Sequence, residues 1–223
     1  MKRIYQGYVA SFKGLSKEVW YLALITFVNR AGTMVIPFLT KYLNEDLNFT
    51  YAQVGWIMVF FGIGSVLGSF LGGKISDKIG FYRVMVLSLL LSGILFIVLQ
   101  FITTFLYLCI AILVLMTVAD MFRPAMFVSL KAYSKLENQT RSLTLVRLAI
   151  NLGFALGPAL GGLIIVTMGY GGLFWVDGIT CILAILLFVK LVKEKKIAKA
   201  DKPVIDKAKK RLIYKDKPFW VQW

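Results

Sequence analysis

Long apolar runs constrain the fold of this chain more than any other feature of its sequence. A bilayer core about 30 Å thick requires roughly 20 apolar residues of helix. Six runs meet this requirement, at residues 19–40, 53–72, 84–103, 105–130, 143–168 and 173–192. Only 17% of the residues are charged, whereas soluble domains carry about 25%. The sequence therefore predicts an all-α membrane protein with six transmembrane helices and excludes a water-soluble fold.

The positions of the basic residues predict an orientation in the membrane. Most of the 26 lysines and arginines lie in four segments, at 1–18, 73–83, 131–142 and 193–217. Lys and Arg accumulate in cytoplasmic loops, so we expect both termini to be cytoplasmic, in the plasma membrane of a bacterium. Topology thus accounts for the net charge of +15. Nucleic acid is not an expected partner, because the basic tail lacks interleaved stacking aromatics.

The chain divides into four parts on this reading. Residues 1–18 are a basic cytoplasmic segment, 19–192 the six-helix bundle, and 193–217 a basic cytoplasmic linker. Residues 218–223 turn apolar again and resemble the start of a seventh helix. We therefore expect a partner for the bundle: a second six-helix half supplied by another chain, a second copy or a missing carboxy-terminal part.

Charged side chains at bilayer depth are candidates for function, because they are costly to insert. Arg30 lies deep in the first run, next to Asn29, and Asp120 and Arg123 lie in the fourth. Asp120 and Arg123 are three residues apart, so they share a helix face and partly neutralise each other. These residues predict a substrate or proton pathway, or else a buried ion-pair network that holds the helices together. Arg147 and Asp177 are expected to matter less.

Two prolines favour a transporter built from repeats. Pro37 follows Arg30 in the first run, and Pro124 follows Arg123 in the fourth. A proline inside a helix permits a bend. Polar, bendable helices at the first position of each three-helix set fit a 3+3 repeat around a cavity at the membrane midplane. Aromatic and methionine side chains are candidates to line it, namely Phe27, Met34, Phe38, Trp56, Phe60, Met121 and Phe127.

Two series of glycines recur at four-residue spacing. Small residues at this spacing let helices in lipid approach each other closely, so we expect tight packing of both helices. The series are Gly64, Gly68 and Gly72 in the second run and Gly153, Gly157 and Gly161 in the fifth.

Two stretches of the sequence have the residues and spacing of known motifs. The turn after the second run matches G-x3-D-[RK]-x-G-[RK]-[RK] at Gly73, Asp77, Lys78 and Gly80, with Phe81 and Tyr82 in place of the usual basic pair and Arg83 slightly later. The fifth run matches G-x3-G-P-x2-G-G at Gly153, Gly157, Pro158, Gly161 and Gly162. The first stretch resembles the turn motif, and the second the antiporter motif, of the major facilitator superfamily.

This resemblance implies the amino-terminal half of a twelve-helix fold, most similar to the drug:proton antiporter branch. It implies a secondary active transporter that exports small amphiphilic molecules in exchange for protons by alternating access. In the family, the loop aspartate, here Asp77, docks against the other half and closes the inward gate, and the antiporter motif lies between the halves. We assign the proton-responsive role to Asp120 and the charge of the cavity to Arg30 and Arg123.

The sequence departs from the family at the coupling residue and leaves alternatives open. The branch has an arginine early in the fourth helix, where this chain has Leu113 or its neighbours. The oligopeptide branch has ExxER in its first helix, where this chain has Thr26, Asn29 and Arg30. A proton-coupled peptide or nutrient importer of the same fold is one alternative. A truncated, non-transporting fragment or a membrane assembly subunit is another.

Enzymatic activity is not expected. The chain has no His, and it lacks the H-E-x-x-H, G-x-S-x-G and P-loop patterns of metalloproteases, hydrolases and nucleotide-driven pumps. Cys109 and Cys181 lie inside apolar runs without CxxC spacing, so neither a disulfide framework nor a zinc site is supported. We predict no cofactor and no bound metal.

Overall fold

The computed structural model describes residues 14–195, and all of its regular structure is helical. Residues 1–13 and 196–223, which include the predicted start of a seventh helix, lie outside the described residues. The helices are α2 (Lys17–Ala31), α3 (Val35–Glu45), α4 (Tyr51–Ile79), α5 (Phe81–Leu99), α6 (Phe105–Asp120), α7 (Phe122–Tyr133), the 3₁₀ turn η1 (Leu136–Asn138) and α8 (Gln139–Leu191).

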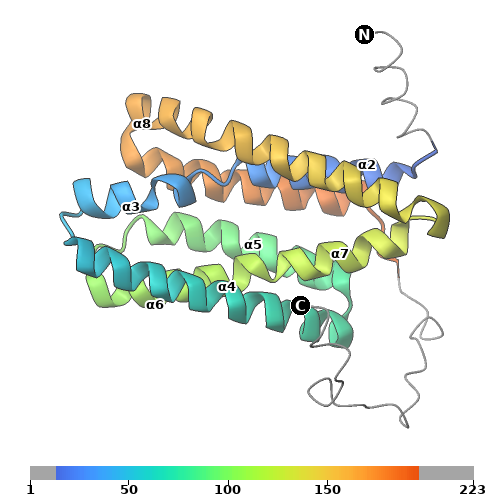
Figure 1. Ribbon diagram of the computed structural model, residues 1–223, viewed down its shortest axis with the longest axis horizontal. Coiled ribbons are helices and arrows are strands. Elements are labelled where there is room, and N and C mark those ends of the chain that lie inside the picture. Colours follow the sequence, from blue (N-terminus) through green and yellow to red (C-terminus); the bar gives the residue numbers. More distant parts are fainter. Residues whose placement is uncertain (1–13, 196–223) are drawn as a thin grey trace, which may run out of the picture.

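Within the described residues, five helical segments are long and apolar enough to cross a membrane. Two of them are the consecutive pairs α2–α3 and α6–α7, and the last contains η1 and α8. The backbone of α8 leaves helical geometry at Gly169, with φ 72° and ψ −177°. Figure 1 shows that α8 doubles back into two limbs. The limbs before and after Gly169 correspond to the fifth and sixth predicted runs.

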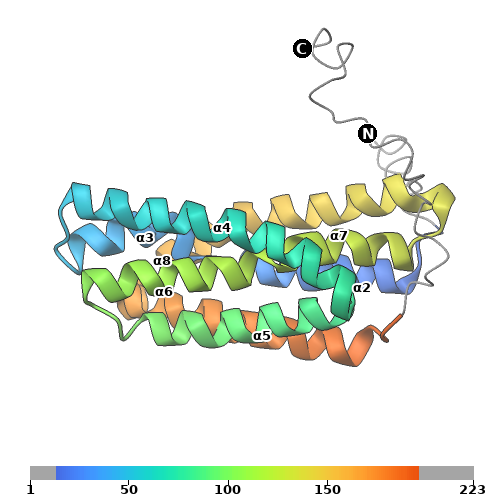
Figure 2. The same cartoon turned by 90° about the horizontal axis from the view of Figure 1, so that it is seen from below.

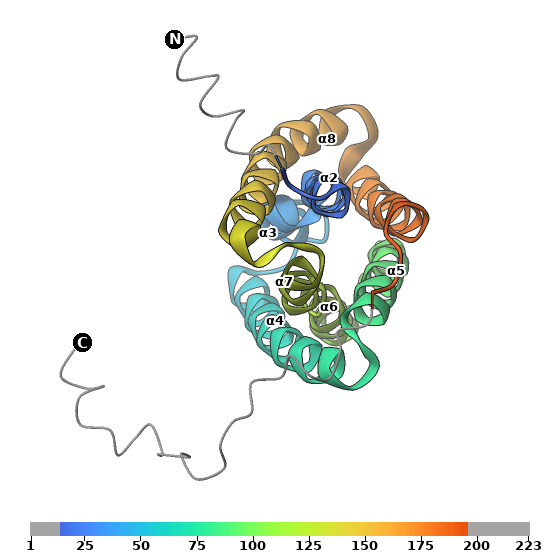
Figure 3. The same cartoon turned by 90° about the vertical axis from the view of Figure 1, so that its right-hand side faces the viewer.

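The helices lie side by side in an elongated bundle, as Figure 2 shows. Viewed along its length, the two limbs of α8 flank α2, while α4 lies beside α6 and α7 (Figure 3). Two sequence-distant pairings thus dominate, α2 with α8 and α4 with α6.

The buried apolar side chains form two clusters at different levels of the bundle. One is built from the buried residues between 19 and 25 of α2, between 81 and 89 of α5 and between 122 and 130 of α7, with residues of α8. The other is built from the buried residues between 34 and 43, in and just before α3, between 96 and 99 of α5 and between 108 and 116 of α6. Along each of these helical segments, the residues between the two clusters include the polar ones: Asn29 and Arg30, Ser92, and Asp120. The packing therefore leaves a polar level near the middle of the bundle.

The turn expected at residues 73–83 is almost entirely helical. Helix α4 continues to Ile79, α5 begins at Phe81, and the single residue Gly80 joins them with φ 91°. A side chain is strained at such a φ, so glycine suits this position. At its other end, α4 begins in a capping box: Thr50 accepts from Gln53 N–H, and the Gln53 side chain accepts from Thr50 N–H.

Candidate functional site

Two of the membrane segments are interrupted at the polar level. Helix α2 ends at Ala31 and α3 begins at Val35, while α6 ends at Asp120 and α7 begins at Phe122. Pro37 and Pro124 are each the third residue of the new helix. A proline there removes the N–H that would bond the carbonyl four residues earlier, that of Thr33 or Asp120. The interruptions therefore lie just before the prolines and next to Arg30 and Asp120.

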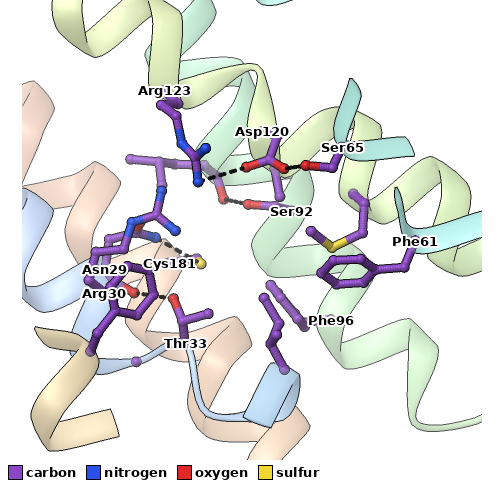
Figure 4. A pocket seen from close by; sticks show the side chains of 16 residues that line it. Asn29, Arg30, Thr33, Phe61, Ser65, Ser92, Phe96, Asp120, Arg123 and Cys181 are labelled. Atoms are coloured by element: carbon purple, nitrogen blue, oxygen red, sulfur yellow. Dashed lines mark hydrogen bonds and ion pairs between the residues drawn. The ribbon is translucent and has the colours of Figure 1, made fainter. Parts of the chain in front are cut away.

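A cavity of about 230 Å³ lies at this level. Figure 4 shows the side chains of Asn29, Arg30, Asp120 and Arg123 around it. The other lining residues are Gly32, Thr33, Ile36, Phe61, Ser65, Leu89, Ser92, Phe96, Met116, Ala119, Phe154 and Cys181. The structure therefore brings together the four residues that we assigned to a substrate or proton pathway.

Asp120 is the acidic centre of this cavity and is only 6% exposed. One of its carboxylate oxygens accepts a hydrogen bond from the Ser65 hydroxyl of α4. The other lies 3.9 Å from Nη2 of Arg123, one turn further along the chain. Asp120 is thus held by two groups from different helices, and a change in its charge alters both contacts.

Arg30 and Asn29 line the opposite side of the cavity. The Arg30 guanidinium lies 5.5 Å from the centre of the Phe154 ring, within the range of a cation–π contact. No carboxylate lies within ion-pairing distance of it among residues 14–195. Asn29 is buried, and its amide donates to the Cys181 sulfur at 3.4 Å. Arg30 therefore adds a positive charge to the cavity.

Asp177 is the residue whose importance the sequence analysis underestimated. We expected it to matter less than the deeper charges, but it is 1% exposed, within the second limb of α8. Its two carboxylate oxygens accept from the backbone N–H groups of Met34 at 2.7 Å and Val35 at 2.9 Å. Asp177 thereby caps the start of α3 across the bundle. No sequence signal pointed to this role, because the break between Ala31 and Val35 is seen only in the structure.

None of the seven aromatic and methionine side chains expected in the cavity lines the central cavity. Trp56 is 61% exposed on α4, and the apolar lining of the central cavity comes mainly from Phe61, Phe96, Phe154 and Met116. Phe127 lines an adjoining hollow. Helical spacing alone did not reveal which face of each helix turns inward.

The first glycine series packs against the backbone of α6 and α7. A Cβ at Gly64 would lie 2.5 Å from the Leu113 carbonyl oxygen, and one at Gly72 would lie 2.7 Å from Cα of Met121. At Gly68 it would overlap the Thr117 carbonyl oxygen. These glycines let α4 approach the segment that carries Asp120.

The antiporter-like series packs against α2 and α3 of the same chain. A Cβ at Gly153 would lie 2.6 Å from Cβ of Arg30, and one at Gly161 would lie 2.7 Å from the Phe38 ring. At Gly157 it would lie at an ordinary 3.4 Å from the Thr33 carbonyl oxygen, and at Gly162 it would have more room. Pro158 is inside α8, directly after Gly157. The buried glycine stripe therefore contacts the interrupted first segment.

The residues of the turn motif lie away from the cavity. Asp77 and Lys78 are exposed in the last turns of α4, and a Cβ at Gly73 would meet no neighbour within 4 Å. Arg83 lies 3.8 Å from Glu194, at the end of the described chain. Within residues 14–195, no hydrogen bond or ion pair engages the Asp77 carboxylate. The motif is therefore placed on the bundle surface.

An all-helical membrane bundle with interrupted helices around a charged cavity defines the class of integral membrane transporter. Residues 22–223 match the Major Facilitator Superfamily. The chain belongs to this family of transporters, and it is not an enzyme.

Two curated relatives show how far the similarity extends. The chain is 25% identical over 183 residues to the quinolone resistance protein NorA of Staphylococcus aureus (strain MRSA252), which covers 82% of this chain and 47% of NorA. It is 32% identical over 81 residues to the uncharacterized MFS-type transporter YceJ of Bacillus subtilis (strain 168), which covers 36% of this chain and 21% of YceJ. The chain thus matches less than half the length of each relative.

Proposed function

We propose that this chain is the amino-terminal half of a proton-coupled exporter of small amphiphilic molecules. The central cavity is the observation that carries the proposal. It brings the buried carboxylate of Asp120 together with Arg30 and Arg123, close to the points where two membrane segments are interrupted. In alternating access, the substrate site lies where such discontinuous helices meet. The distant similarity to NorA supports export of drug-like molecules.

The position of the interruptions supports a 3+3 arrangement of six helices. If α8 is counted as two crossing limbs, α2–α3 is the first crossing segment and α6–α7 the fourth. Both carry an arginine near the interruption and a proline at the third residue of the new helix. In this arrangement both termini lie in the cytoplasm, and the membrane is the bacterial plasma membrane.

Asp120 is proposed to respond to protons. Protonation would remove its negative charge, weaken the contact with Arg123 and free a positive charge in the cavity. The two broken segments would then shift relative to each other. In the same scheme, Asp77 would dock against a second six-helix half and close the inward gate.

Transport by the complete product of the gene that encodes this chain tests the proposal. Everted membrane vesicles are energised with an inward-acid pH gradient, and uptake of a fluorescent quinolone is followed. We expect uptake that collapses with the gradient and is lost in Asp120→Asn. The matched control is Asp46→Asn, which changes an exposed acid in the loop after α3 and is expected to transport normally.

Several outcomes of this transport experiment would contradict the proposal or favour one of the alternatives. Uptake that persists in Asp120→Asn, or that ignores the gradient, would contradict proton coupling through this residue. Accumulation of peptides in intact cells, without quinolone export, would favour the importer alternative. Absence of flux for either class would favour a fragment or assembly subunit.

A further inference from the structure

The central cavity continues into a groove that is lined by basic residues. A hollow of about 440 Å³ between α2, α7 and α8 shares Arg30, Arg123 and Phe154 with the central cavity. A third hollow, of about 450 Å³, shares Arg147 and Phe127 with the second. We call these two connected hollows the basic groove.

The basic groove runs along α7 toward the end of the bundle near Tyr133. Arg123, Phe127 and Lys131 are spaced by four residues, so they share one face of α7. Arg147 of α8 lines both hollows. The groove therefore leads from the middle of the bundle to the basic segment 131–142, which we predict to be cytoplasmic.

Charge in the groove is strongly unbalanced. The groove and the central cavity together are lined by four basic side chains, those of Arg30, Arg123, Arg147 and Lys131. Asp120 is the one acidic residue among the lining residues of these three hollows, and it already contacts Arg123. Arg30 lies at membrane depth, where an unpaired positive charge is unfavourable, whereas Arg123, Arg147 and Lys131 are exposed along the groove. The missing compensation points to an anionic ligand.

Thr26 supplies a second, independent indication. It lines the groove next to Arg30 and is 1% exposed. Its hydroxyl has no hydrogen-bond partner among the described residues. Buried hydroxyls are normally paired, so this hydroxyl is a polar group next to the groove that the described residues leave unsatisfied.

The remaining lining residues of the groove indicate which chemical groups the ligand carries besides its anionic group. Phe127, Phe154, Met126 and Ile150 provide apolar and aromatic walls. Guanidinium groups bind carboxylate and similar oxyanions through paired, charge-assisted hydrogen bonds. Resting on the proposed transport function, we propose that the basic groove binds amphiphilic organic anions, with the anionic head at Arg30 and Arg147 and an aromatic body between them and the phenylalanines.

Equilibrium binding tests this proposal without any gradient or flux. The purified 223-residue chain is placed in nanodiscs of zwitterionic phosphatidylcholine and dialysed against 2-naphthoate, 2-naphthamide or 2-naphthylmethylammonium, with empty nanodiscs subtracted. We expect saturable binding of naphthoate, at least about tenfold tighter than that of the neutral amide, as one charge-assisted contact allows. Equal binding of acid and amide, or a preference for the cation, would overturn the proposal.

Variants in the groove locate the site. Arg30→Gln and Arg147→Gln should each weaken naphthoate binding about tenfold, while Arg147→Lys should retain most of it because the charge remains. Arg141→Gln is the matched control: Arg141 and Arg147 are both exposed and lie six residues apart on α8, but Arg141 is absent from the lining of the groove. Size-exclusion profiles and helix content verify that each variant is folded. Unchanged binding in both glutamine variants would overturn the proposal.

A lipid headgroup is the other source of an anionic head. Replacing about a fifth of the phosphatidylcholine by phosphatidylglycerol should leave naphthoate binding within about twofold if the groove selects soluble anions. Loss of binding would assign the groove to anionic lipid and overturn the proposal. Because no transport is measured, failure of proton-driven flux and failure of anion binding are separately observable.

Discussion

At the scale of single residues, Asp177 has the most clearly defined structural role. Its carboxylate accepts from two N–H groups at the start of α3, those of Met34 and Val35, and the Met34 N–H also bonds the Gly32 carbonyl oxygen. Asp177→Leu would leave the Val35 N–H buried and unpaired and would weaken the bonding of the Met34 N–H, which costs roughly 1–3 kcal/mol of stability. Asp177→Asn keeps one acceptor oxygen and should lose about half as much. Thermal unfolding in detergent, followed by circular dichroism, measures both.

A peripheral acid provides the comparison for this prediction. Asp46→Asn changes an exposed carboxylate just after α3 and should unfold at the wild-type temperature. If Asp177→Leu also unfolded at that temperature, the cap would contribute nothing to the stability of the interruption in the first segment.

At the scale of helices, glycine positions determine how closely pairs of segments approach. Gly68→Ala places a methyl group against the Thr117 carbonyl, and Gly153→Ala places one against Arg30. We expect each to destabilise the bundle by about 1–3 kcal/mol. Gly157→Ala should be tolerated, because its Cβ would lie at an ordinary contact distance. Unfolding by added sodium dodecyl sulfate ranks these variants.

The open face of α4 offers the control for this ranking. A Cβ at Gly62 would meet nothing within 4 Å, so Gly62→Ala should be neutral or slightly stabilising, since alanine favours helix. Equal losses in Gly62→Ala and Gly68→Ala would show that helix flexibility, and not the approach of α4 to α6, is what the glycines provide.

At the scale of the whole molecule, the distribution of charge predicts the orientation in the membrane. The end of the bundle with Lys74, Lys78 and Lys135 should face the cytoplasm, because basic loops are retained there. In intact cells, a membrane-impermeant maleimide should label Asp46→Cys but label Lys135→Cys only after permeabilisation. The native Cys109 and Cys181 are buried and should react little. The opposite labelling pattern would invert the proposed direction of transport.

The fold was predictable to the extent that it follows from local pattern. Every α-helix overlaps one of the six apolar runs, and the reversal at Gly169 falls between the fifth and sixth. The deep charges Arg30, Asp120 and Arg123 were recognisable because charge inside an apolar run is rare. Their meeting in one cavity was a hypothesis until the packing of α2, α6 and α7 was known.

Side-chain direction and long-range pairing could not be obtained from the sequence. The inward turn of Phe61 instead of Trp56, and the contact of Asp177 with residues more than 140 positions earlier, depend on how the helices are rotated and paired. Hydropathy identifies the segments that enter lipid. Such a segment must be helical, because its backbone groups can form hydrogen bonds only within the helix there. Hydropathy carries little information on which apolar face meets protein, since lipid and protein interiors are similarly apolar. The close approach of helices at glycines and the buried polar contacts make that choice, and both exist only in the assembled bundle.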